Sequence, residues 1–189
     1  MLLRNYAVCL CRRACYMDLG GDGIKVASKL FQQAAWIFEQ LMTMSSQLPP
    51  GVASTDFNKE TLVMNSNLCL AQAQYLFFKM ASDKNMPPTI LSKVAAQVSI
   101  YFQKAHDNNQ TNSSLRAHES GKFANVLGYH SRYFLAQAYW VLGQQAFTQA
   151  GDAGKGMNMA VAYLTVAVEK FTEAKPYVNQ LGGAYQANF

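Results

Sequence analysis

The sequence lacks any apolar run long enough to cross a membrane as a helix. Such a span needs about 18 or more consecutive apolar residues, and no window of this chain provides them. The N-terminal stretch is apolar, but Arg4, Arg12 and Arg13 interrupt it and no small-residue cleavage site follows. We therefore expect an amphipathic first helix rather than a signal peptide, and a soluble protein rather than a membrane protein.

Charged residues are also scarce, at 14% of the chain. The 16 Lys and Arg against 11 Asp and Glu leave a formal net charge of +5, a mild bias toward acidic partners. The basic residues are spread along the chain without the clustered stripe that nucleic-acid binding requires, so no nucleic-acid partner is expected. With 189 residues, half of them hydrophobic, residues 1–189 are predicted to form a single domain.

The four cysteines follow neither a disulfide framework nor a metal-ligand spacing. Cys9, Cys11 and Cys15 fall in one predicted helix, where Cys11 and Cys15 share a face while Cys9 points away, and Cys69 is distant in the sequence. Three ligands arranged in this way cannot surround one metal ion. We interpret the cysteines as buried structural thiols of a protein in a reducing compartment.

Residues that could support catalysis are not grouped in any familiar pattern. His106, His118 and His130 have no carboxylate at metal-site spacing, and are predicted to be solvated or capping residues. The glycine-rich stretch 151–156 lacks the Ser or Thr and the preceding strand of a phosphate-binding loop. No nucleophile or carboxylate pair stands in a catalytic context, so we predict no enzyme, cofactor or metal site.

Alternation typical of β-strands is absent, whereas helical periodicity runs from end to end. The pattern predicts an all-α fold of antiparallel helical hairpins in a TPR-like solenoid, although no clean repeat of about 34 residues is present. The first expected helix ends near Asp18. The five that follow span about 24–48, 56–82, 87–106, 120–149 and 157–177.

Turn-forming and capping residues set the expected helix boundaries. The glycines between residues 20 and 23 provide left-handed geometry after the first helix, and Asp56 is the expected N-cap of the third. Pro87 and Pro88 fall where proline is tolerated, in a first helical turn. Residues 108–114 are rich in Asn, Gln, Ser and Thr, and we predict that they form a loop.

Residues 67–97 read NLCLAQAQYLFFKMASDKNMPPTILSKVAAQ, and contain a Leu-Ala-Gln-Ala-Gln motif, paired aromatics, a turn with Asp and a following apolar helix, in that order. This segment closely resembles the BRO-one domain of the ALIX family of ESCRT-associated scaffolds. Looser similarity covers residues 2–10, 29–38 and 130–145. The resemblance implies an incomplete BRO-one domain, without the family's strand-containing N-terminal part and C-terminal segment.

The resemblance also implies a binding function. In the family, an apolar patch receives the amphipathic C-terminal helix of an ESCRT-III filament subunit, and by the motif this patch falls on Phe77, Ile90 and Val94. Val94 stands where the family usually has Leu. The smaller side chain reduces the contact area, but the contact remains apolar. A cytoplasmic adaptor, associated indirectly with endosomal membranes, is therefore expected.

The helix around residues 87–106 is apolar over a wide arc. Ile90, Val94 and Tyr101 lie within about 40° of one another, and a second apolar edge at Leu91, Ala95 and Phe102 lies roughly 100° further round. A helix that faces the core with one stripe needs an apolar arc of only about 100°. Two readings remain: both edges are buried between neighbouring helices, or the first edge is an exposed patch.

With the resemblance, we favour the exposed patch, flanked by Lys93 and Lys104 and suited to an acidic amphipathic helix. The alternative function is a generic TPR-like scaffold with another peptide ligand. A helical domain without its covering segments is also expected to self-associate through uncovered apolar faces.

Overall fold

Six α-helices account for most of the residues that the computed structural model describes, which are 1–47, 57–113, 121–151 and 154–181. No strand occurs in these ranges. The helices are α1 (Leu2–Cys15), α2 (Gly23–Ser45), α3 (Lys59–Asp83), α4 (Pro88–Thr111), α6 (Lys122–Ala150) and α7 (Met157–Leu181).

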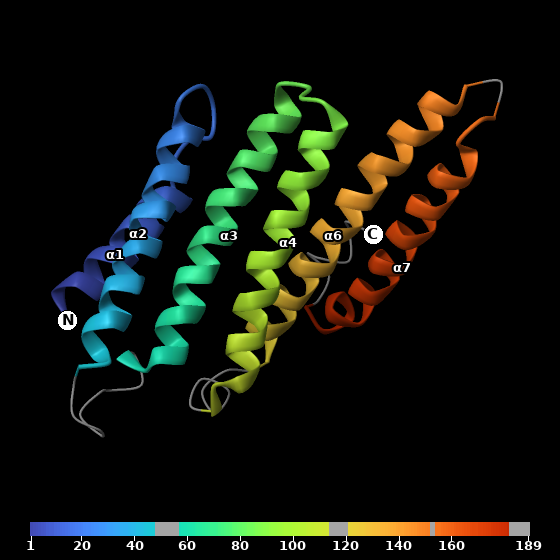
Figure 1. Ribbon diagram of the computed structural model, residues 1–189. Helices are drawn as coiled ribbons and strands as arrows, with labels where there is room; N and C mark the ends of the chain where they lie inside the picture. Colours follow the sequence, from blue (N-terminus) through green and yellow to red (C-terminus); the bar gives the residue numbers. More distant parts are fainter. Residues whose placement is uncertain (48–56, 114–120, 152–153, 182–189) are drawn as a thin grey trace.

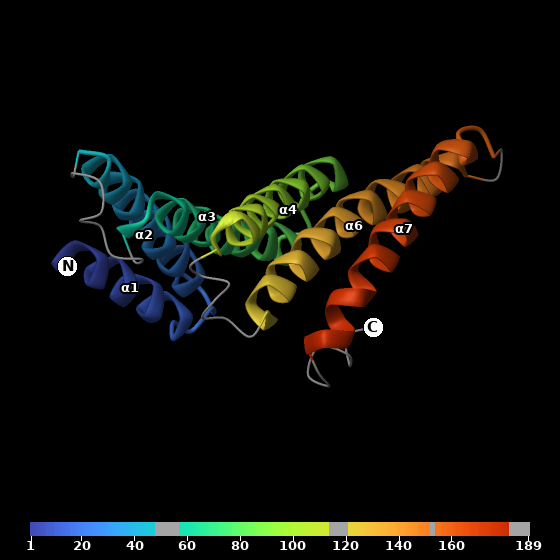
Figure 2. The same ribbon diagram turned by 90° about the horizontal axis from the view of Figure 1, so that it is seen from below.

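The helices lie in a row, in chain order, and successive helices run antiparallel (Figure 1). Each packs mainly on the helix before it and the helix after it, and the row twists along its length (Figure 2). The predicted all-α solenoid of helical hairpins is thus confirmed. Within the described part of the chain, no helix combines the length and apolar character needed to cross a membrane.

The hydrophobic core is divided along this row. One cluster joins α1, α2 and α3 around Phe31, Phe38 and Leu62, and a second joins α3, α4 and α6 around Val98 and Leu127. A third, smaller cluster lies between α6 and α7. Because each cluster is shared only by neighbours, the fold has the nearest-neighbour stability of solenoid proteins.

The turn between α3 and α4 is closed by a Schellman motif. Asn85 adopts a left-handed conformation, with φ of 49°, and its N–H donates to the carbonyl of Ser82 at 2.9 Å. The N–H of Met86 donates to the carbonyl of Ala81 at 3.0 Å, which satisfies a second free carbonyl of the helix end. Pro87 is then the N-cap of α4 and Pro88 its first residue, close to the prediction.

Two of the predictions about helix boundaries were wrong. The N-cap of α3 is Asn58, whose side chain accepts a hydrogen bond from the N–H of Glu60 at 3.2 Å, and Asp56 lies outside the described residues. Of the glycines after α1, only Gly21 has a positive φ. Gly23 is required for a different reason, because a Cβ there would lie 1.9 Å from the carbonyl oxygen of Asp18.

The polar stretch predicted to be a loop at 108–114 is largely helical, since α4 continues to Thr111. Asn109 and Asn112 are buried against α3. The Asn112 side-chain amide donates to the Thr61 hydroxyl at 2.9 Å, and the Asn109 amide contacts the Met64 sulfur at 3.7 Å. Amide side chains can be buried when they form hydrogen bonds. The polar composition of this segment alone did not indicate that burial.

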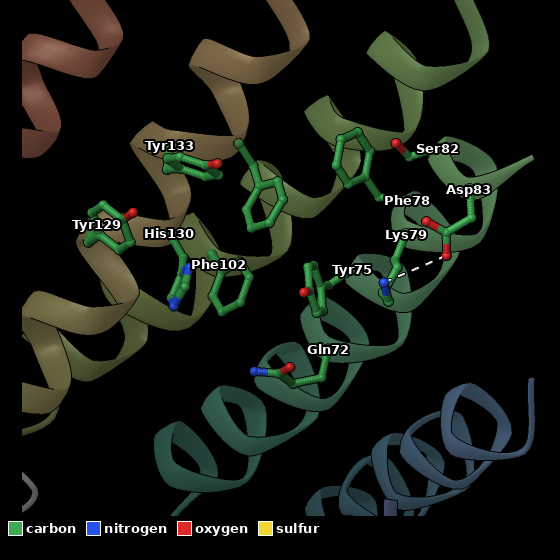
Figure 3. Close-up of a pocket in the computed structure, with 11 residues that line it drawn as sticks. Gln72, Tyr75, Phe78, Lys79, Ser82, Asp83, Phe102, Tyr129, His130 and Tyr133 are labelled. Carbon is green, nitrogen blue, oxygen red and sulfur yellow. Dashed lines mark ion pairs between the residues drawn. The ribbon is translucent and has the colours of Figure 1, made fainter. Parts of the chain in front are cut away.

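The histidines were predicted to be solvated or capping residues, and this was wrong for His106 and His130. His118 lies outside the described residues. His106 is buried. The ring of His130 stacks on Phe102, with centroids 4.9 Å apart (Figure 3). Burial lowers the pKa of His130 to about 4, so its imidazole is neutral at pH 7 and functions as an aromatic packing group.

Close packing of α7 on α6 depends on a glycine. A Cβ added to Gly128 would lie 2.4 Å from Cε1 of the Tyr177 ring, well inside van der Waals contact. Gly128 is itself buried in the N-terminal part of α6. The ring of Tyr177 therefore occupies the space that any other residue at position 128 would need.

We predict that Gly128→Ala destabilises the protein, although Gly→Ala in a helix interior ordinarily stabilises by about 1 kcal/mol. Overpacking costs about 1–3 kcal/mol, so a net loss of about 1 kcal/mol and a fall in Tm of about 2–4 °C are expected by thermal melts. In a Tyr177→Ala background the same substitution should be neutral or stabilising. A stabilising effect in the wild-type background would contradict the close contact.

Candidate protein-docking surface

The residues that the sequence predicted for partner binding lie on α3 and α4. Phe77 is six residues before the end of α3 and Val94 six residues after the start of α4, so the antiparallel hairpin brings them to the same level. Ile90 and Tyr101 share a side of α4 with Val94, by their helical spacing. We call Phe77, Ile90, Val94 and Tyr101 the α3–α4 face.

The exposure of these side chains distinguishes the two edges of α4. Phe77 and Ile90 are each 42% exposed, and Val94 and Tyr101 are half-buried. On the second edge, Ala95 and Phe102 are buried and Leu91 is half-buried. The wide apolar arc therefore has one edge in the core and one edge that is partly open to solvent.

The two lysines predicted at the rim are exposed. The Lys104 ammonium lies 5.9 Å from the centroid of the Tyr101 ring, a weak cation–π contact that holds the charge beside the apolar residues. Within the described residues, neither Lys93 nor Lys104 pairs with a carboxylate. Both charges are consequently available to an acidic ligand at the edge of the α3–α4 face.

A second concave surface was not identified from the sequence. It is a pocket of about 630 Å³ between α3, α4 and α6. Its lining is mainly aromatic, and is made of Gln72, Tyr75, Phe78, Lys79, Ser82, Asp83, Phe102, Tyr129, His130, Tyr133 and Phe134 (Figure 3). The spacing of Tyr129 with Tyr133 and of His130 with Phe134, four residues apart on one helix, was the signal available in the sequence.

This aromatic pocket opens on the side opposite the α3–α4 face. Tyr75 and Lys79 each stand two positions from Phe77, which is about 200° round the helix axis. Asp83, the single carboxylate among the lining residues, pairs with Lys79 at 3.6 Å. Together with the neutral His130, this leaves the pocket without an unpaired acid or base, and its surface is suited to packing contacts.

Neither surface has the composition of a catalytic or metal site. Among the described residues, no group of three or more His, Cys, Asp or Glu side chains could hold a metal ion. The α3–α4 face offers apolar side chains with cations at its edge. The α3–α4 face can therefore bind an apolar surface of a ligand and orient a negative charge on that ligand.

Comparison with known proteins identifies the family. A model described as "BRO1-like domain" matches residues 2–188. The chain is 38% identical over 92 residues to "ALG-2 interacting protein X" of Dictyostelium discoideum, covering 49% of this chain and 12% of that protein. It is 28% identical over 155 residues to human "Tyrosine-protein phosphatase non-receptor type 23", covering 81% of this chain and 9% of that protein.

Solved structures share the fold. The "ALIX BRO1 CHMP4C complex" superposes with a TM-score of 0.83 at 24% identity, covering 98% of this chain and 50% of that chain. A crystal structure of ALIX with a SIVmac239 late-domain peptide gives a TM-score of 0.82 at 23% identity, covering 98% and 25%. The chain spans only about a tenth of the length of the curated relatives it matches. Across nearly all of its length, this chain belongs to the BRO1-like domain family.

Proposed function

We propose that this chain is a non-catalytic adaptor whose α3–α4 face docks the amphipathic C-terminal helix of an ESCRT-III subunit. The observation that carries the proposal is the partial exposure of Phe77 and Ile90, two large apolar side chains from adjacent helices. The related ALIX BRO1 domain has been solved in a complex with CHMP4C. Family membership and exposed apolar residues thus favour the same surface.

The chemistry of the α3–α4 face fits a helix in a shallow groove. An amphipathic helix presents apolar anchors at three- and four-residue spacings, which match an apolar strip such as Ile90, Val94 and Tyr101. Lys93 and Lys104 lie at the edge, where opposite charges on a partner raise the association rate and fix its register. An acidic helix with an apolar stripe is therefore the expected ligand.

This function places the protein in the cytoplasm, recruited to endosomal membranes through its protein partner. A generic scaffold with another peptide ligand is the second candidate, and the aromatic pocket lined by Tyr75, Tyr129 and Tyr133 is the observation that favours it.

Ile90→Asp is expected to abolish binding of an ESCRT-III tail peptide while leaving the helical content and Tm close to those of the wild type. A charge at the centre of an apolar interface costs at least about 2 kcal/mol, more than a thirtyfold loss of affinity. At a partly exposed position the folding cost is small. Peptide titration and circular dichroism melts measure the two effects separately.

Val8→Asp is the matched control, because Val8 is 45% exposed, is also β-branched and helical, and lies on α1. It should retain full affinity for the peptide. A folded Ile90→Asp variant that binds the peptide normally would refute the proposed site. An unfolded one would show instead that Ile90 is needed for the core.

Salt should slow association with the tail peptide without abolishing the complex. Raising ionic strength from about 0.1 M to about 1 M shortens the Debye length from about 10 Å to about 3 Å, which screens the rim lysines but not the apolar centre. Stopped-flow kinetics should show a lower association rate with a nearly constant dissociation rate. The double variant Lys93→Ala/Lys104→Ala should lose most of this dependence, and an unchanged dependence would remove both lysines from the interface.

We also propose that the chain self-associates through the outer face of α7. Val161 and Val168 are 57% and 60% exposed there, and with Leu164 they form an apolar stripe at helical spacing. Light scattering should show concentration-dependent dimers, and Val168→Glu should shift the protein toward monomer. A strictly monomeric wild-type chain at high concentration would contradict this proposal without affecting the α3–α4 face.

A further inference from the structure

Two cysteines that are far apart in the sequence meet between α1 and α3. The Cys11 and Cys69 sulfurs are 3.3 Å apart, although 58 positions separate the residues. α1 packs mainly on α2, and this thiol pair is a direct contact from α1 to α3. The sulfurs need to approach by only about 1.3 Å to reach the covalent separation of about 2.05 Å.

The four cysteines are not equivalent, which corrects their interpretation as buried structural thiols. Cys9 and Cys15 are exposed, Cys11 is half-buried and only Cys69 is buried. Cys11 belongs to the edge of the first core cluster, and Cys69 lies within it. An oxidant can consequently reach Cys11 from solvent, whereas Cys69 is buried.

Their hydrogen bond makes the two thiols chemically different. Donation from the Cys69 thiol stabilises a Cys11 thiolate and lowers the pKa of Cys11. The same bond, with burial, raises the pKa of Cys69. The thiolate is the nucleophilic form of cysteine, so the accessible member of the pair is also the more reactive one.

We propose that Cys11 and Cys69 form a reversible redox site, which hydroperoxides such as hydrogen peroxide convert into a disulfide joining α1 to α3. The proposal is independent of the docking function, because it rests on the contact of two sulfurs in the first core cluster. The oxidant class is a small hydroperoxide, which can reach a thiol that is half-buried.

The reaction balances in two steps. The Cys11 thiolate attacks one oxygen of the peroxide, an S–O bond forms, the O–O bond breaks, and hydroxide leaves. The Cys69 sulfur then attacks the Cys11 sulfur, an S–S bond forms and the S–O bond breaks. The departing hydroxide takes the Cys69 proton and leaves as water. The two thiols supply the two electrons that the peroxide gains.

A disulfide here would fix the end of the helical row. α1 is the first helix of the described row and packs mainly on α2, so a covalent bond to α3 restrains it at a second point. Closing a loop of 58 residues removes much conformational freedom from the unfolded chain. The oxidised protein is therefore expected to be more resistant to heat than the reduced protein.

The test uses the full chain with Cys9→Ser and Cys15→Ser, which removes the two exposed thiols. Hydrogen peroxide under native conditions should consume both remaining thiols, lower the intact mass by two hydrogens, and yield a cross-linked peptide containing Cys11 and Cys69. The Tm should rise by about 5–10 °C and return to its first value on treatment with dithiothreitol. The same cross-linked peptide should be recovered from the peroxide-treated wild-type chain.

The matched control adds Cys69→Ser to this variant. Without the second thiol, Cys11 should stop at the sulfenic acid, which dimedone traps, and the Tm should not rise. The proposal is overturned if the peroxide leaves both thiols free, if it gives only disulfide-linked dimers, or if Cys11 proceeds to the sulfinic acid while Cys69 remains a thiol.

Discussion

The structure depends on one constraint, which is that each inner helix of the described row packs on its two neighbours along opposite flanks and leaves two faces uncovered. The core clusters are each shared by consecutive helices, and so the uncovered faces line up on opposite sides of the molecule. One side carries Phe77 and Ile90, and the other carries the aromatic pocket around Tyr75 and His130. A binding surface in such a fold is assembled from residues of adjacent helices rather than from loops.

Packing in this protein relies heavily on polar and small residues at helix contacts. Asn112 bonds to Thr61, Ser28 donates to the carbonyl of Ala73, and Gly128 makes room for Tyr177. Each of these contacts joins two helices, through the C-cap of α4 in the case of Asn112. They fix the register between neighbouring helices more specifically than apolar contacts do, because a hydrogen bond or a close approach is lost after a shift of one residue.

More of the fold than of the surface features could be predicted from the sequence. Helical periodicity predicted the helices at nearly their observed positions, and the motif at 67–97 led to the family. Phe77, Ile90 and Val94 were predicted from the same motif, and Tyr101 from its helical spacing. The aromatic pocket and the Cys11–Cys69 contact did not follow, because each combines residues from helices whose relative rotation no local pattern specifies.

The sequence alone determined where most of each helix lies and which arc of α4 is apolar, since both are local consequences of residue spacing. The tertiary structure decided how each polar or ambiguous residue is used. Asn109 and His130 read as solvent-facing by residue type, yet the first is buried against α3 and the second stacks on Phe102. Whether a side chain is buried depends on the neighbouring helices and on the packing or hydrogen-bonding partners that they provide. It therefore follows only from the packing of those helices.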